Sequence, residues 1–201
     1  MKKIITVFAL IFTVAINAQT AKDYFNKGNT DMGNGAYQSA IMYFSKAIEL
    51  NPKDAQSYGG RAFCKKSQKD YKGAIEDYTK AIEYQPNFSS AYSERGECKF
   101  GLNDFKGDIE DQDKAIQQYP QGASMYHYLK GAARCMLTEY KEAIVDFNKS
   151  IELNNNYDMP FLMRGKCKYK LNDKAGACGD FKKAQSLGNT DAITLVRSLC
   201  K

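Results

Sequence analysis

Residues 55–88 read AQSYGGRAFCKKSQKDYKGAIEDYTKAIEYQPNF, and this stretch decides the fold. In its first part Tyr58, Ala62 and Lys65 follow one another at the helical spacings of four and three. Its second part carries an apolar stripe at the same spacings, formed by Tyr71, Ala74, Ile75, Tyr78, Ala81 and Ile82. A polar turn over residues 68–70 separates the two patterns, and Pro86 ends the second one. The stretch therefore predicts a hairpin of two amphipathic helices.

The same pattern recurs along the chain with a period of 34 residues. Two series of small residues have spacings of 34, 34, 35 and 34: Gly28, Ala62, Gly96, Gly131 and Gly165, and Ala47, Ala81, Ala115, Ser150 and Ala184. Both place one inserted residue between Pro120 and Gly131. Five copies result, over residues 21–54, 55–88, 89–123, 124–157 and 158–191. A single hairpin cannot bury its apolar face, so neighbouring copies must stack, and a last helix over 191–200 is expected to cap the array.

These residues resemble the tetratricopeptide repeat (TPR) family. Its pattern is an aromatic residue, a small residue four positions later, and then aromatic, Ala, aromatic, Ala and Pro, which the second copy supplies as Tyr58, Ala62, Tyr71, Ala74, Tyr78, Ala81 and Pro86. The resemblance covers residues 21–191. It implies an all-α, right-handed α-solenoid of about five helix-turn-helix hairpins with a C-terminal capping helix. The third copy departs from the pattern at Asp108 and Gln112, and the fourth places His127 where the family has an aromatic residue.

The first eighteen residues, MKKIITVFALIFTVAINA, have the pattern of a secretory signal peptide. Lys2 and Lys3 precede an apolar run, and Ala18 provides a small residue before the expected cleavage site. The run is shorter than the roughly 20 apolar residues of a membrane anchor, and no Cys near the cut supports a lipoprotein. We therefore expect a mature chain of residues 19–201 in the bacterial periplasm or outside the cell, with no membrane span after signal removal.

Charged residues are distributed evenly and recur with the repeat. The chain of 201 residues has 29 Lys and Arg against 23 Asp and Glu, an excess too weak to predict nucleic-acid binding. Basic residues precede the small residue in four copies, and an acid follows each after sixteen positions: Arg61, Arg95, Lys130 and Arg164, with Asp77, Asp111, Asp146 and Asp180. These residues could form a basic surface for anionic ligands or a ladder of ion pairs between stacked helices. We favour the ladder, because a basic surface would not need a matching carboxylate at every step.

The six cysteines offer two alternative disulfide pairs, both of which use Cys178. Cys64, Cys98 and Cys167 share one repeat position on the first helices, which lie about 8–10 Å apart at best, while a disulfide needs Cα atoms within about 7 Å. Buried thiols are the expectation there. Cys178 and Cys200 are the best disulfide candidate in an oxidising compartment, and Cys167 with Cys178 is the second. Free thiols remain the alternative, because connectivity cannot be read from sequence.

No catalytic constellation is present in the sequence. His127 is the only histidine and occupies a packing position, so that triads built on an imidazole have little basis. Phosphate-binding and dinucleotide-binding glycine motifs are absent from the sequence, as is CxxC. We expect a protein that is not an enzyme and that has no cofactor or metal.

The TPR resemblance implies that the first helices line a concave groove that receives a peptide or protein segment. The groove-binding candidates are Phe25, Asn29, Phe63, Lys66, Glu97, Phe100, Tyr128, Lys166 and Tyr169. Some of them could instead be core residues. The carboxylate clamp of some family members is not supported, because Phe25, Gly60, Ser90 and Glu94 stand where the clamp has Lys, Asn or Arg.

The sequence thus predicts a protein-interaction module or assembly scaffold of the cell envelope, with self-association as a further possibility. A glycan or cell-wall binding module is the alternative, because groove tyrosines could stack on sugars.

Overall fold

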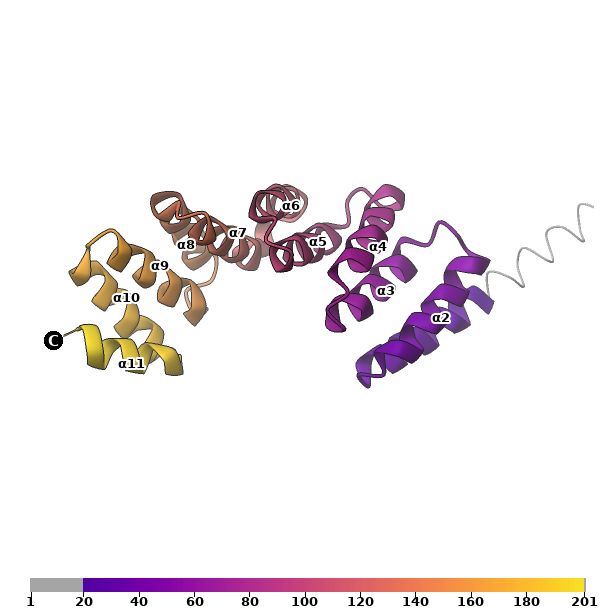
Figure 1. The fold of residues 1–201 in the computed structure, drawn as a ribbon, viewed down its shortest axis with the longest axis horizontal. Coiled ribbons are helices and arrows are strands. Elements are labelled where there is room, and N and C mark those ends of the chain that lie inside the picture. The colour runs from indigo at the N-terminus through magenta and orange to yellow at the C-terminus, as the bar shows by residue number, and fades with distance from the viewer. Residues whose placement is uncertain (1–19, 201) are drawn as a thin grey trace, which may run out of the picture. The chain divides into compact units, whose positions relative to one another are not determined.

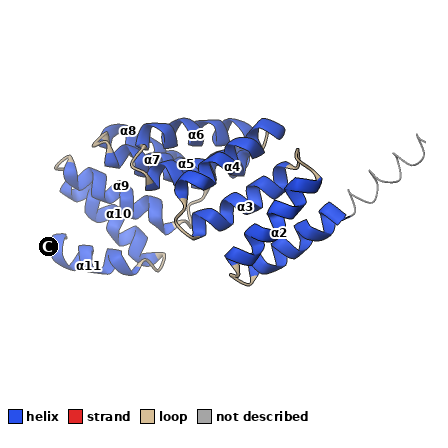
Figure 2. Cartoon of the chain, turned by 45° about the vertical axis from the view of Figure 1, so that its right-hand side comes forward, coloured by secondary structure: helices blue, strands red, loops and turns tan. Residues whose placement is uncertain are grey.

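The computed structural model describes residues 20–200, and this part of the chain is helical throughout, with short connecting loops and no strand (Figure 2). The predicted signal peptide, residues 1–18, lies outside the described residues. A first helix comprises residues 20–33 of the described part. It is followed by α2 (Tyr37–Leu50), α3 (Ala55–Ser67), α4 (Tyr71–Tyr84), α5 (Ser89–Gly101), α6 (Phe105–Gln118), the 3₁₀ helix η1 (Pro120–Gly122), α7 (Ser124–Met136), α8 (Tyr140–Leu153), α9 (Asp158–Lys170), α10 (Lys174–Ser186) and α11 (Thr190–Leu199) (Figure 1).

The helices form the hairpins that the 34-residue period predicts. The chain divides into two compact units, Met1–Cys98 (unit 1) and Lys99–Lys201 (unit 2). Within unit 1, α3 packs against α2 and α4; within unit 2, each helix from α6 to α11 packs against the next in the chain. The fold is thus the all-α TPR solenoid class that the sequence predicts.

In most hairpins the first helix needs a small residue, because an aromatic ring of the second helix packs directly against it. Phe44, Phe147 and Phe181 are fully buried. A Cβ atom added at Gly28 would lie 2.8 Å from the Phe44 ring, and one at Gly131 would lie 2.7 Å from Phe147. The ring fills the space that the missing side chain leaves, which is how close packing is reached.

The third repeat replaces this aromatic core with a buried polar pair. Asp108 and Gln112 are both buried, and the Gln112 side-chain amide donates a hydrogen bond to Asp108 Oδ1 at 2.9 Å. The bond lowers the cost of placing two polar groups in the interior, since buried polar groups require partners. The third copy therefore departs from the family pattern only in the polarity of two buried side chains, and the helix itself is unchanged.

The turn inside each hairpin has one residue with a left-handed backbone conformation, always at the same repeat position: Gly35, Lys69, Asn103, Thr138 and Asn172. In three repeats the next residue is an aspartate whose carboxylate accepts a hydrogen bond from the backbone N–H three positions on, as Asp70 does from Gly73 at 3.0 Å. Such a bond satisfies one of the free N–H groups at a helix start. The fourth repeat has Thr138 and Glu139 here, and the Glu139 side chain makes no cap bond.

The two irregular features of the array lie where the sequence predicts them. The inserted residue of the third copy falls in η1. The capping helix α11 lies next to α10 (Figure 1) and packs on it. It buries Ala192, and the Asn189 side chain caps its first turn by accepting a hydrogen bond from Ala192 N at 3.0 Å. None of the described helices combines the length and apolar character needed to cross a membrane.

Candidate functional site

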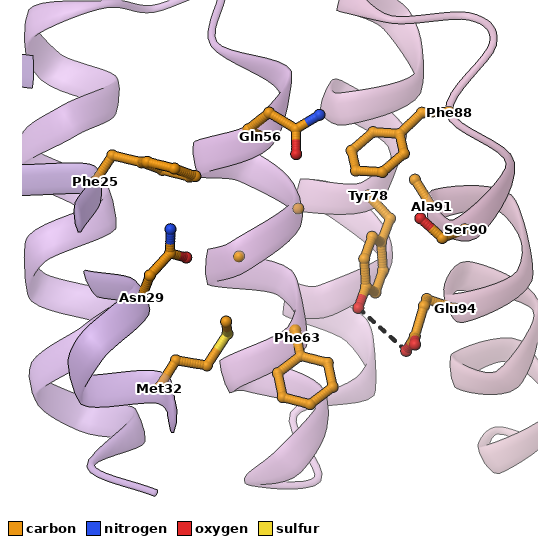
Figure 3. A pocket seen from close by; sticks show the side chains of 12 residues that line it. Phe25, Asn29, Met32, Gln56, Phe63, Tyr78, Phe88, Ser90, Ala91 and Glu94 are labelled. Atoms are coloured by element: carbon orange, nitrogen blue, oxygen red, sulfur yellow. Dashed lines mark hydrogen bonds between the residues drawn. The ribbon is translucent and has the colours of Figure 1, made fainter. Parts of the chain in front are cut away.

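A surface cavity of about 250 Å³ lies within unit 1. The helix over residues 20–33, α3, α4, α5 and the α4–α5 loop contribute its lining. The lining residues are mostly apolar or aromatic: Phe25, Asn29, Met32, Gln56, Gly59, Gly60, Phe63, Tyr78, Phe88, Ser90, Ala91 and Glu94 (Figure 3). Ligand-binding sites usually have this composition, an apolar lining with a few polar groups.

Two adjacent glycines of α3, Gly59 and Gly60, line the cavity. A Cβ atom at Gly60 would lie 2.5 Å from the ring of Phe44, so that only glycine fits there without a shift of a buried ring. At Gly59 the added Cβ would lie 3.2 Å from Phe88, a side chain that is only partly buried. The floor of the cavity is therefore bare helix backbone.

The charged groups at the cavity lie on one wall, around Glu94, while Asn29 and Gln56 contribute neutral amides from the helix over residues 20–33 and from α3 (Figure 3). Glu94 accepts a hydrogen bond from the Tyr78 hydroxyl at 3.4 Å (Figure 3). The Lys66 ammonium forms ion pairs with Glu94 and, at 3.1 Å, with Glu97, which ties α3 to α5. Burial raises the pKa of the Tyr78 hydroxyl, and the Glu94 carboxylate raises it further. Tyr78 therefore serves as a neutral hydrogen-bond donor.

The same wall also shifts the pKa of Glu97. Burial raises this carboxyl pKa and the Glu94 charge raises it further, against the lowering effect of Lys66. The lining residues include one acid, Glu94, and no lysine or arginine. The cation beside Glu94, Lys66, is already paired with Glu94 and Glu97. A carboxylate ligand would therefore have to compete with both acids for it, whereas a neutral ligand would not.

The structure places the groove candidates of unit 1 in and beside this cavity. Phe25, Asn29 and Phe63 line it, and Lys66 and Glu97 lie on its polar wall. Gly60, Ser90 and Glu94, which stand at clamp positions of the family, also line it. Sequence reasoning missed Gln56, Tyr78 and Phe88. The repeat pattern gave no signal for Phe88, because it lies in a loop, and it assigned Tyr78 to the core.

The groove candidates of unit 2 have varied surroundings. Phe100 packs edge-to-face on Phe105, with ring centroids 5.1 Å apart, and Tyr128 packs against Phe147 and Tyr157. Lys166 and Tyr169 are exposed. Tyr128 is thus partly a packing residue of its repeat. The sequence had left open that some of the groove candidates are core residues, and Tyr128 is an example.

The repeated charges form ion pairs inside the hairpins. Arg61 binds both carboxylate oxygens of Asp77, at 2.8 and 2.7 Å, and Arg164 binds Asp180 in the same two-pronged way. This confirms the ladder interpretation for these two repeats. In the fourth repeat Arg134 takes the direct contact with Asp146, at 2.8 Å, while Lys130 remains 3.8 Å away.

The ladder has two further components that sequence reasoning missed. A second cation reaches the same carboxylates: Lys65, Lys99 and Lys168 lie 2.8 Å from Asp77, Asp111 and Asp180. The first cation also reaches back to the preceding repeat, as Arg61 does to Ser45, Arg95 to Thr79 and Arg164 to Asn148. The recurrence of Lys65 after 34 residues at Lys99 was a usable signal. Since these cations are engaged with protein groups, they have a structural role.

His127 and the cysteines are the remaining side chains that could take part in chemistry. The His127 ring is mostly buried, its Nδ1 has no hydrogen-bond partner among the described residues, and Asp146 is 3.8 Å away. Cys178 and Cys200 are joined by a disulfide with Cα atoms 5.5 Å apart. Cys167, the other partner weighed for Cys178, is a free thiol. The described residues contain no group of three or more His, Cys, Asp or Glu side chains that could hold a metal ion.

Comparison with known proteins agrees with this architecture. Residues 22–54 and 55–88 each match a model of the tetratricopeptide repeat. The matches identify residues 22–88 as two tetratricopeptide repeats. A curated relative, Protein SGT1 homolog from Bos taurus, is 33% identical over 67 residues, which are 33% of this chain and only 20% of that protein.

Solved structures of TPR proteins share the fold at low sequence identity. MamA from Desulfovibrio magneticus RS-1 superimposes with a TM-score of 0.78 at 18% identity, covering 84% of this chain and 94% of MamA. PilF from Pseudomonas aeruginosa gives 0.78 at 20%, covering 89% and 81%. YrrB, described as a TPR protein with an unusual peptide-binding site, gives 0.76 at 18%, covering 95% and 98%.

Proposed function

We propose that this protein is a non-catalytic interaction module that binds a peptide or protein segment in the unit 1 cavity. The TPR fold is that of a protein-interaction module. The observation that carries the finer proposal is the glycine-floored cavity, whose apolar rim of Phe25, Met32, Phe63 and Phe88 suits an apolar anchor side chain of a partner.

The polar wall around Glu94 sets the expected chemistry of the partner. Glu94 and the neutral Tyr78 hydroxyl can accept or donate hydrogen bonds to a peptide backbone, an amide or an amino group. A free carboxyl terminus is disfavoured, because Lys66, the cation next to the lining residue Glu94, is already paired with Glu94 and Glu97. The partner segment therefore combines an apolar anchor with neutral or basic neighbours.

We further propose that the protein works in the cell envelope or outside the cell. Residues 1–18 have the pattern of a signal peptide, and the Cys178–Cys200 disulfide suits an oxidising compartment. A scaffold that holds an envelope assembly through one segment of its partner fits both observations.

A peptide-binding measurement with two matched glycine variants tests the cavity. Peptides with an aromatic or large aliphatic anchor, selected on wild type from a displayed library, are measured by calorimetry against Gly59→Ala and Gly179→Ala. The first variant adds a methyl group to the cavity floor at the cost of a small shift of Phe88, while the second adds one at an exposed site of α10 with nothing within 4 Å.

We expect Gly59→Ala to weaken binding about tenfold or more, because part of an anchor worth roughly 1.5–3 kcal/mol is displaced. Gly179→Ala should bind like wild type, and both variants should melt within a few degrees of it. Equal binding by all three proteins would place the ligand elsewhere. Selection of peptides through a free carboxylate, or binding of wall polysaccharide alone, would also contradict the proposal.

A further inference from the structure

Two free cysteines of unit 2 lie in sulfur–sulfur contact. Cys135 is near the end of α7 and Cys167 is on α9, and their Sγ atoms are 2.8 Å apart. This is closer than the van der Waals contact of two sulfur atoms. The two helices belong to successive repeats, so the contact joins the fourth repeat to the fifth.

The pair escaped sequence reasoning because its members occupy different repeat positions. Cys167 shares the buried position of Cys64 and Cys98, and is 1% exposed. Cys135 lies two residues beyond that position, and its side chain is partly exposed. The other repeats have Met32, Lys66, Phe100 and Tyr169 there. Equivalent cysteines of neighbouring repeats are too far apart to bridge, but this offset brings the two sulfurs together.

The two remaining free thiols have a different environment. Burial raises the pKa of Cys64 to about 11 and that of Cys98 to about 12, as expected of inert packing thiols. At Cys167 the hydrogen bond from the Cys135 thiol lowers the pKa and outweighs the effect of burial. The first proton is therefore lost more easily from the pair than from either buried single thiol.

We propose that Cys135 and Cys167 form a second, reversible disulfide that links α7 to α9. Cys135 is the point of entry, because Cys167 is buried. Both residues pack in one cluster with Phe147, Tyr128 and Met163, so the bond would hold this part of the fourth and fifth repeats together. It adds a covalent link between repeats that are otherwise held by packing and ion pairs.

The oxidant is a low-molecular-weight disulfide of the glutathione type. Cys135 passes its proton to the Cys167 thiolate as its own sulfur attacks one sulfur of the small disulfide, which forms a mixed disulfide and releases one thiolate. The Cys167 thiolate then attacks Cys135 Sγ, breaks the mixed disulfide and releases the second thiolate, and the two released thiolates take up the two protons lost from the protein thiols. One small disulfide is reduced to two thiols while two protein thiols become one disulfide.

Thiol counting in the full chain tests the proposal. The protein is equilibrated in mixtures of oxidised and reduced glutathione, quenched with acid, unfolded and alkylated, and the alkylated cysteines are located by mass spectrometry. In oxidising mixtures we expect two alkylated residues, Cys64 and Cys98, and a cross-linked peptide pair that contains Cys135 and Cys167. Cys135→Ser should give three alkylated residues, and the matched variant Cys64→Ser should give one.

A second readout uses a background in which Cys178→Ser and Cys200→Ser remove the other disulfide. In this background the oxidised protein should melt at a higher temperature than the reduced one, and adding Cys135→Ser should abolish the difference. Four alkylated cysteines in every mixture, with the Cys178–Cys200 bond intact, would overturn the proposal. A cross-link between Cys167 and Cys178 would overturn it equally.

Discussion

Single carboxylates connect the helices of a hairpin. Asp77 receives two bonds from Arg61 and one from Lys65, while its side chain is 6% exposed. Asp180 has the same environment from Arg164 and Lys168. Removal of a buried carboxylate leaves two cations without their partner, and this loss is larger than the net contribution of the intact pair.

At the residue scale we therefore predict that Asp180→Ala lowers the free energy of unfolding by about 3 kcal/mol. Thermal or urea unfolding measures the change. The control is Asp113→Ala, which removes the Lys130 partner at a carboxylate that is 54% exposed and should change stability by less than about 1 kcal/mol. Peptide binding in unit 1 should be unaffected by either change. Equal free energies of unfolding for the two variants would contradict a structural role of the ladder.

Helix connections repeat their backbone geometry more faithfully than their sequence. The left-handed position holds Gly35, Lys69, Asn103, Thr138 and Asn172, at φ values between 61° and 75°. Asparagine tolerates this conformation, whereas a β-branched residue such as threonine is strained in it. The fourth repeat therefore has the least favourable turn chemistry, and it also lacks the aspartate cap of three other repeats.

At the element scale we predict that Thr138→Asn raises the free energy of unfolding by about 1 kcal/mol, because it relieves this strain. The reciprocal variant Asn103→Thr introduces the same strain into the third repeat and should lower it by a similar amount. Urea unfolding of both variants measures the effect. A neutral result in both turns would show that the backbone position tolerates threonine.

The helices and turns could be predicted because each hairpin carries its own signals. The ring of Phe44 and the missing side chain of Gly28 are complementary, and both recur at fixed spacing, so one copy predicts the next. The cavity could not be predicted in the same way. It depends on Gly59, which only the second repeat combines with Gly60, and on the loop residue Phe88. The Cys135–Cys167 contact depends on the angle between two helices, which the period does not specify.

On the scale of the whole molecule, the proposed export determines which residues remain in the mature protein. We predict that the protein purified from its native cell begins at Gln19 and that mass spectrometry finds the Cys178–Cys200 disulfide in it. The physical reason is that the apolar run of residues 4–16 is read as a signal and removed during export. A variant with Ala18→Arg should retain the longer chain, because a bulky charge replaces the small residue at the cut. A chain that keeps residues 1–18 in wild type would contradict the proposal.

The disulfide near the C-terminus also determines what remains after unfolding. Cys178 and Cys200 are 22 positions apart, so the chain between them is a covalent ring that heat or urea cannot open. A protease or translocating pore that draws in the unfolded chain must admit a doubled strand when it reaches this ring. Passage through a pore that admits a single strand therefore requires reduction of this bond, so we expect complete unfolding to depend on the redox state of the surroundings as well as on folding stability.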